Sequence, residues 1–233
     1  MHAIVDYLRV ELPRLRCRYR WPIPHIEGFP QSGEDSYEAN VALKKFLHNR
    51  WVSAATDAQR VEVSEFVIAD WGGVRRNSRS TLKRYIDEIE KENPATPMKG
   101  VASYSKLFSI AQPDRYSIYD ARVAACLNAI QYQADPRNGV AFNYCPGRNN
   151  QIGNAKTRTG FVYEEEFRVR TLVGSGWTRI RRDDTYSLYL QLLSDCLAEL
   201  PKYERHDFEM VLFANAEIET GKAIAIAKNS RCP

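Results

Sequence analysis

Residues 99–130 read KGVASYSKLFSIAQPDRYSIYDARVAACLNAI, and the rest of the chain is predicted to be organised around this stretch. Its pattern predicts a helix over residues 102–111, a polar turn, an extended segment and a second helix over residues 121–133. Lys106 falls in the first helix and Asp120 at the start of the second. No other stretch of the sequence places a candidate nucleophile and a carboxylate on so ordered a local frame.

The two charged residues of this stretch suggest chemistry on a nucleotide sugar. A lysine attacks the sugar carbon C1′ only as the neutral amine, and burial beside apolar side chains such as Leu107 and Phe108 favours that form. A carboxylate stabilises the positive charge that develops on the sugar as a base departs. Asp120 suits this role because the N–H groups and the dipole of a helix start orient a carboxylate. Spacing alone also allows the plainer interpretation, in which Lys106 is solvated and Asp120 only caps its helix.

Length and composition favour a single globular domain. The 233 residues, 44% of them hydrophobic, can build one sizeable core, or one core divided between two helical lobes. No apolar run approaches the roughly 20 residues of a membrane-spanning helix. The N-terminal segment lacks the apolar stretch of a signal peptide. We therefore expect a cytoplasmic monomer with no membrane partner.

The cysteines are scattered, and their spacing indicates neither a zinc site nor an iron–sulfur cluster. There are five, namely Cys17, Cys126, Cys145, Cys196 and Cys232. We therefore expect no metal and no cofactor.

The formal charge of +4 is mildly basic, which suits nucleic acid without requiring it. The basic residues form two clusters, Arg75, Arg76, Arg79, Lys83 and Arg84, and Arg168, Arg170, Arg179, Arg181 and Arg182. A phosphate-binding surface and an ordinary solvated face are equally good interpretations of these clusters.

Apolar periodicity and capping residues predict a mainly α protein. Further helices are expected over 1–20, 36–54, 57–70, 79–92, 184–200 and 206–219. Residues 161–171 fit either a helix or a strand, and the tail from residue 221 is weakly patterned. We therefore expect one domain over residues 1–233, built of two intertwined helical lobes.

Residues 134–160 form the longest segment without helical periodicity. A loop of this length in a compact domain is usually functional or disordered, and both alternatives stay open. If it is functional, its polar residues can read base edges or phosphates. These are Asn143, Arg148, Asn149, Asn150 and Gln151.

Three short motifs carry a resemblance to a known superfamily. Gly100-Val101 followed by Ser103-Tyr104-Ser105-Lys106 looks like a hairpin and its lysine, and Ile118-Tyr119-Asp120-Ala121-Arg122-Val123 looks like an aspartate opening the next helix. Glu209-Met210-Val211-Leu212-Phe213 is similar to a late helix. The chain thus resembles the helix–hairpin–helix DNA glycosylases, in particular bacterial 8-oxoguanine-glycosylase-like proteins without an iron–sulfur cluster. It departs from them in lacking the second hairpin glycine and in its shorter interval from lysine to aspartate.

The resemblance, which spans roughly residues 60–215, implies a helix–hairpin–helix element and a cleft for double-stranded DNA between the lobes. It implies a DNA glycosylase that flips a damaged or modified base and cleaves its glycosidic bond, with Asp120 and Lys106 as catalytic residues. Whether Lys106 adds β-lyase activity stays open, as does the choice between repair and antiviral excision of modified phage bases. The base would be sandwiched by Phe142, Tyr144 and Trp177, with Trp71 ranked behind them. DNA or substrate contacts are assigned to Gly100, Ser103, Ser105, Arg122, Arg75, Arg76, Asn143 and Arg148.

Two other functions remain open at this point. One is a non-catalytic helical protein whose hairpin only grips DNA phosphates, and the other is a helical interaction module with no nucleic-acid role.

Overall fold

The computed structural model describes residues 2–30 and 35–230, so Cys232 lies outside the described residues. Helices dominate the fold, which confirms the predicted mainly α class. Within the described residues, no helix is long and apolar enough to cross a membrane.

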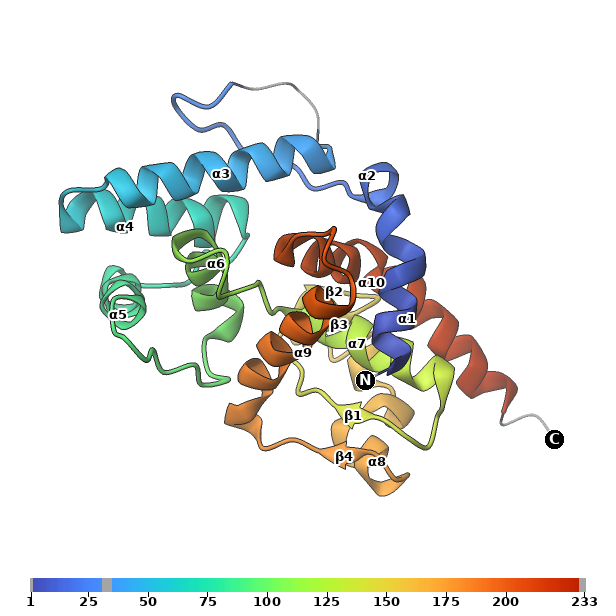
Figure 1. The fold of residues 1–233 in the computed structure, drawn as a ribbon. Helices are drawn as coiled ribbons and strands as arrows, with labels where there is room; N and C mark the ends of the chain where they lie inside the picture. The colour runs from blue at the N-terminus through green and yellow to red at the C-terminus, as the bar shows by residue number, and fades with distance from the viewer. Residues whose placement is uncertain (1, 31–34, 231–233) are drawn as a thin grey trace.

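One group of helices comes from the middle of the chain and lies together in Figure 1. It contains α3 (Tyr37–Ser53), α4 (Asp57–Glu65), the π-helical segment η2 (Phe66–Trp71), α5 (Arg79–Ile89) and α6 (Val101–Ala111). The predicted caps form here, because Ser36 accepts from Ala39 N and Thr56 makes a capping box with Gln59.

The second group combines the two ends of the described chain with its centre (Figure 1). It contains α1 (His2–Glu11), η1 (Leu12–Arg14), α2 (Leu15–Arg18), α7 (Ala121–Ala134), α9 (Thr185–Glu199) and α10 (Arg205–Asn229). Helix α10 packs along α7 and continues through the stretch from residue 221 that looked weakly patterned in sequence. The prediction of a helix ending at residue 219 was therefore wrong, because Ala223 and Ala227 are small residues that still bury their side chains.

The long segment 134–160 is ordered, so the disordered alternative is wrong. It contains β1 (Val140–Ala141), which pairs in parallel with β4 (Thr178–Arg179), and β2 (Arg148–Asn149), which pairs antiparallel with β3 (Gly153–Asn154). The ambiguous stretch after it forms short helical turns rather than a strand. These are η3 (Phe161–Tyr163), η4 (Glu165–Phe167) and α8 (Val169–Gly174), with η5 (Arg182–Asp184) preceding α9.

Helix α6 is enclosed on nearly all sides, which sets the position of the candidate site. Every residue of α6 except Ala102 is buried. It packs against α3, α5 and η2, and its C-terminal end leads through an extended segment into α7. The interpretation of Lys106 as a solvated residue is therefore wrong, because this lysine is only 6% exposed.

Candidate functional site

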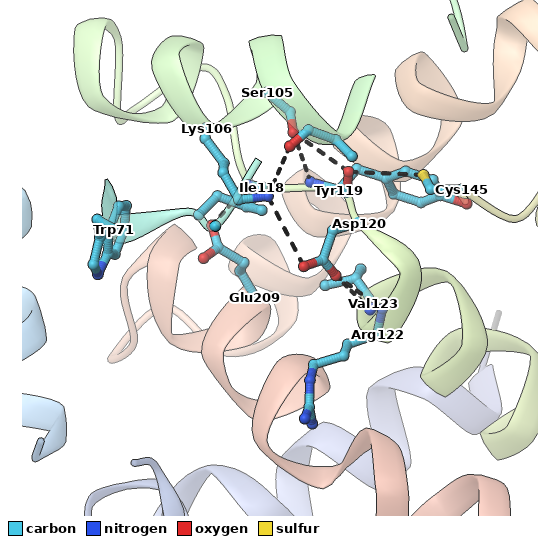
Figure 2. Close-up of polar contacts among 12 residues, drawn as sticks. Trp71, Ser105, Lys106, Ile118, Tyr119, Asp120, Arg122, Val123, Cys145 and Glu209 are labelled. Carbon is cyan, nitrogen blue, oxygen red and sulfur yellow. Dashed lines mark hydrogen bonds and ion pairs between the residues drawn. The ribbon is translucent and has the colours of Figure 1, made fainter. Parts of the chain in front are cut away.

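Lys106 and Asp120 converge on one cavity. The Lys106 Nζ lies 4.0 Å from the Asp120 Oδ2, and Figure 2 shows the lysine descending from α6 toward the carboxylate. Both side chains are largely shielded from solvent, at 7% and 17% exposure. The pair is therefore placed where water screens its electrostatic interaction less than at the surface.

The cap of α7 orients Asp120 and leaves one of its oxygens for other contacts. Oδ1 accepts from the backbone N–H groups of Arg122, at 2.9 Å, and Val123, at 3.1 Å (Figure 2). These bonds satisfy two of the orphan donors of the helix start. Oδ2 remains directed toward Lys106 and the cavity. The capping role therefore holds the carboxylate in place for a second role.

Lys106 reaches the cavity past a glycine. A Cβ added to Gly72 would lie 2.4 Å from the Lys106 Cδ and 2.7 Å from the Val67 carbonyl oxygen. The end of the π-helical segment thus makes room for the lysine stem, as π-helical turns often do at functional sites. The ammonium group donates to the carbonyl oxygen of Ala102 at 2.7 Å. The amine is therefore held by one backbone bond and faces one carboxylate.

The extended segment that ends at Asp120 is held from two sides. Ser105 Oγ accepts from the Tyr119 N–H at 3.1 Å, and Glu209 Oε2 accepts from the Ile118 N–H at 2.8 Å. The other oxygen of Glu209 accepts from Lys44 Nζ at 2.8 Å, in a buried ion pair. Side chains from α6 and α10 thus set the backbone just before the catalytic candidate (Figure 2).

The cavity has a volume of about 200 Å³ and walls from distant parts of the chain. Its aromatic lining consists of Tyr19, Trp21, Trp71 and Phe213. The Trp21 and Phe213 rings meet edge to face, with centroids 5.0 Å apart. An apolar, aromatic chamber beside a lysine and an aspartate suits a flat organic group better than a solvated ion.

Basic and amide side chains close the cavity on the side of α7 and β2. Arg122 pairs with Glu217 at 2.5 Å and lies over the Phe213 ring, 5.1 Å from its centroid. Asn149 donates to the same Glu217 carboxylate at 2.8 Å. Arg148 donates to the carbonyl oxygen of Gly73, which ties the 134–160 segment to the end of η2.

The residues that were expected to form a hairpin include one turn residue, Gly100, and two buried serines, Ser103 and Ser105. Gly100 has a φ of 86°, so it precedes α6 in a left-handed conformation that favours glycine. Ser103 is buried and accepts from Asn77 Nδ2, while Ser105 is fully buried against Tyr119. The assignment of direct DNA contacts to Ser103 and Ser105 is therefore corrected, because both support the fold. Arg75 and Arg76 are exposed.

The aromatic side chains that were expected to sandwich a base lie away from the cavity. Phe142 is fully buried in the core, and Trp177 is 2% exposed with its indole N–H donating to the Pro136 carbonyl oxygen. Tyr144 donates to the carbonyl oxygen of Phe167. Asn143 binds Thr185 Oγ1 at 2.7 Å. None of these side chains lines the cavity at Lys106, whereas Trp71, which ranked last in sequence, does.

Three wall residues have no counterpart among the expected site residues. Tyr19 and Trp21 follow the N-terminal helices, and Phe213 lies on α10 inside the motif that resembled a late helix. The aromatic residues near Trp21 are equally typical of a core, and the motif over residues 209–213 indicated a helix without assigning Phe213 a role. Their role depends on α1, α2 and α10 folding back over α7, which local sequence does not encode.

No known family, no curated protein and no solved structure matches the chain. Among residues 2–30 and 35–230, no group of three His, Cys, Asp or Glu side chains is placed to hold a metal ion.

Proposed function

We propose that the protein is a DNA glycosylase that extrudes a damaged or modified base into the cavity and cleaves its glycosidic bond. The observation that carries the proposal is the buried pair of Lys106 and Asp120, 4.0 Å apart at an aromatic chamber. A flipped base is stabilised by stacking against aromatic side chains, which offsets the few kcal/mol of its unstacking from the duplex.

Asp120 supplies the electrostatic part of the reaction. As the bond between C1′ and the base lengthens, positive charge develops on the sugar, and Oδ2 stabilises it at short range. The departing base takes the bonding electron pair and then a proton from water. Asp120 keeps its orientation throughout because its other oxygen is fixed by the two N–H groups of α7.

Lys106 completes the reaction as nucleophile. Its ammonium group releases a proton to water, so that Asp120 stays ionised, and the neutral amine forms a bond to C1′ as the base leaves. The nitrogen then loses a second proton to water, and opening of the sugar ring yields the Schiff base. Elimination of the 3′ phosphate and hydrolysis of the imine then return the free lysine and a cleaved strand. If Lys106 only stabilises the Asp120 carboxylate, water takes the place of the amine and an abasic site remains.

The DNA would lie along the hairpin and the exposed arginines. The turn before α6 presents Lys99 and Gly100 near the helix N-terminus, a favourable place for a phosphate. Arg75 and Arg76 are exposed in the connection that leads from η2 to α5, and Gly72 in the same connection borders the cavity. We propose that these parts form a helix–hairpin–helix-like phosphate grip beside a cleft between two helical lobes, on DNA of the genome or of a modified phage.

Base release and covalent trapping test the proposal together. Mass spectrometry would identify bases released from a panel of duplexes carrying oxidised, alkylated or phage-type modified bases. Borohydride would trap a Schiff base on abasic DNA in the wild type. The Lys106→Met variant keeps the apolar stem beside Gly72 and removes the amine, so we expect it to lose the trapped adduct completely.

The remaining outcomes separate the alternatives. Base release that survives in Lys106→Met but not in Asp120→Asn would assign a monofunctional enzyme. No base release from any duplex, with salt-sensitive DNA binding retained, would contradict the enzymatic proposal and leave a DNA-binding protein. Absence of DNA binding at low salt would contradict both.

A further inference from the structure

Tyr19 is a buried tyrosine whose hydroxyl group makes no hydrogen bond among the described residues, although the side chain lines the cavity of Lys106 and Asp120. Only 4% of the residue is exposed. Two other buried tyrosines, Tyr85 and Tyr116, also lack a side-chain hydrogen bond among the described residues, but neither lines this cavity. The remaining fully buried tyrosines do have partners. Tyr104, Tyr119, Tyr186 and Tyr189 each donate to a backbone carbonyl oxygen at 2.8–3.1 Å. The Tyr19 hydroxyl therefore has no partner among the described residues and belongs to a side chain of the cavity wall, so it is available to a ligand.

The other neutral polar side chains around the cavity already have hydrogen-bond partners. The Trp21 indole N–H donates to the Trp71 carbonyl oxygen at 3.1 Å, and the Trp71 indole N–H donates to Asn40 Oδ1 at 3.3 Å. The two indoles are therefore held as walls, with their N–H groups unavailable to a ligand. The Glu209 oxygens are taken by Lys44 and Ile118.

The side chains at the opposite wall of the cavity also have partners. Asn149 uses its amide N–H on Glu217 and its oxygen on the backbone N–H groups of Gln151 and Ile152. Arg122 is paired with Glu217. Lys106 and Asp120 serve the sugar in the proposed function, so among the neutral polar side chains of the wall the Tyr19 hydroxyl is the one without a partner among the described residues.

The electrostatic setting keeps this hydroxyl neutral. Burial raises the pKa of Tyr19 well above its ordinary value, and the negative charges of Glu209 and Asp120 raise it further. The phenol therefore retains its proton and can donate to an acceptor.

We propose that Tyr19 is the specificity-determining residue of the site, and that its hydroxyl donates to a ring carbonyl or ring nitrogen of the base held against Trp21 and Trp71. This inference rests on the proposed function, because the ligand is an extruded nucleobase. It predicts that bases which present an acceptor at that edge are released, and that analogues without the acceptor are released poorly. A site that hydrogen-bonds a polar substrate group rejects analogues lacking it more strongly than an apolar wall does.

Tyr19→Phe tests the inference because it removes only the hydroxyl. We expect base release to fall at least about tenfold, whereas borohydride trapping on abasic DNA stays unchanged because no base is present there. Tyr186→Phe is the matched control. Its hydroxyl binds the Ser117 carbonyl oxygen away from the cavity, so the control loses stability without changing which bases are released.

Two results would overturn the inference. An equal loss of base release and of abasic trapping in Tyr19→Phe would show that the hydroxyl only supports the fold. Unchanged base release would show that it does not meet the base.

A second measurement separates this inference from the proposed function. Quenching of tryptophan fluorescence by free adenine, hypoxanthine, cytosine and uracil reports binding without catalysis, because Trp21 and Trp71 line the cavity. We expect a dissociation constant for the preferred base at least about fivefold higher in Tyr19→Phe than in the wild type. If the wild type releases no base but binds free bases in this Tyr19-dependent way, the glycosylase proposal fails and the Tyr19 site stands. Equal binding by both proteins, or no binding by either, would overturn the Tyr19 site.

Discussion

Asp120 and Asp207 both lie at the start of a long helix, but they differ in how their oxygens are used. Asp207 accepts from the Tyr37 hydroxyl at 2.5 Å with Oδ1 and from the Glu204 N–H at 2.8 Å with Oδ2. Asp120 places two N–H groups on Oδ1 and turns Oδ2 toward Lys106, which is 4.0 Å away. A carboxylate whose two oxygens are both paired stabilises a fold, whereas one with a free oxygen in a cavity can also act on a ligand.

The largest effect should come from replacing the Asp120 carboxylate with an amide. In Asp120→Asn the side chain still caps α7, because asparagine is as good a cap as aspartate, but the negative charge is lost. We expect base release to fall about 10²–10⁴-fold with little change in thermal stability. Asp207→Asn is the matched control and should keep its activity per folded molecule. Equal losses of activity in the two variants would contradict the difference drawn between these carboxylates.

The second effect concerns Glu209, which pairs with Lys44 and accepts from the Ile118 N–H just before Asp120. Glu209→Gln can still accept from the Ile118 N–H, but it leaves the buried Lys44 ammonium without its counter-charge. We expect the free energy of unfolding to fall by about 3 kcal/mol in urea titrations. Glu217→Gln is a control, since its pair with Arg122 is partly exposed and should contribute less than about 1 kcal/mol. A Glu209→Gln loss as small as that of the control would mean that the ion pair does not anchor the site.

The third effect concerns His206, the neighbour of Asp207, whose contribution to stability depends on pH. Burial, together with the charges of Lys44 and Lys45, lowers the pKa of His206 to about 4, although Asp207 acts in the opposite direction. The unfolded chain therefore binds a proton near pH 6.5 that the folded protein does not bind until about pH 4. Stability from the neutral His206 is complete above pH 6.5 and is lost as the pH falls toward 4.

Urea titrations at pH 7.5 and pH 5 measure this contribution. We expect the wild type to lose roughly 2 kcal/mol more than His206→Gln between these two values. His25→Gln, at an exposed position, should follow the wild type. A His206→Gln profile identical to that of the wild type would contradict the assignment.

The smallest effect separates a paired from an unpaired tyrosine. Tyr37→Phe removes the donor to Asp207 and should cost about 1–2 kcal/mol of unfolding free energy, because a buried carboxylate oxygen loses its partner. Tyr19→Phe removes a hydroxyl without a partner and should change stability by less than about 0.5 kcal/mol. Thermal melts of the two variants side by side provide the measurement. A larger loss in Tyr19→Phe would mean that its hydroxyl has a structural role.

Local patterns predicted the frame of the site well. The helices around Lys106 and Asp120, the cap at Ser36 and the capping role of Asp120 all depend on neighbours within a few residues. Such features follow from side chains competing for the free N–H groups of a helix start, so they are readable from the order of residues.

The walls of the cavity could not be predicted in the same way. Phe142 and Trp177 looked like base-stacking residues, but they are core residues, one following β1 and the other preceding its partner strand β4. Tyr19 and Phe213 are far apart in sequence, yet both rings border the cavity, with centroids 6.1 Å apart. Which aromatic side chain becomes a wall depends on which helices fold over α7.

The order of residues is enough to predict the mainly helical class, the placement of Lys106 and Asp120 on adjoining helices, and the glycine before α6. The burial of Lys106, the room that Gly72 makes for it and the position of the Tyr19 side chain in the cavity wall become visible only in the folded chain. The two kinds of feature depend on interactions over different distances along the chain. Helix propensity and capping act over a few residues, whereas burial and the pairing of polar groups depend on contacts between segments that meet only when the whole chain has folded.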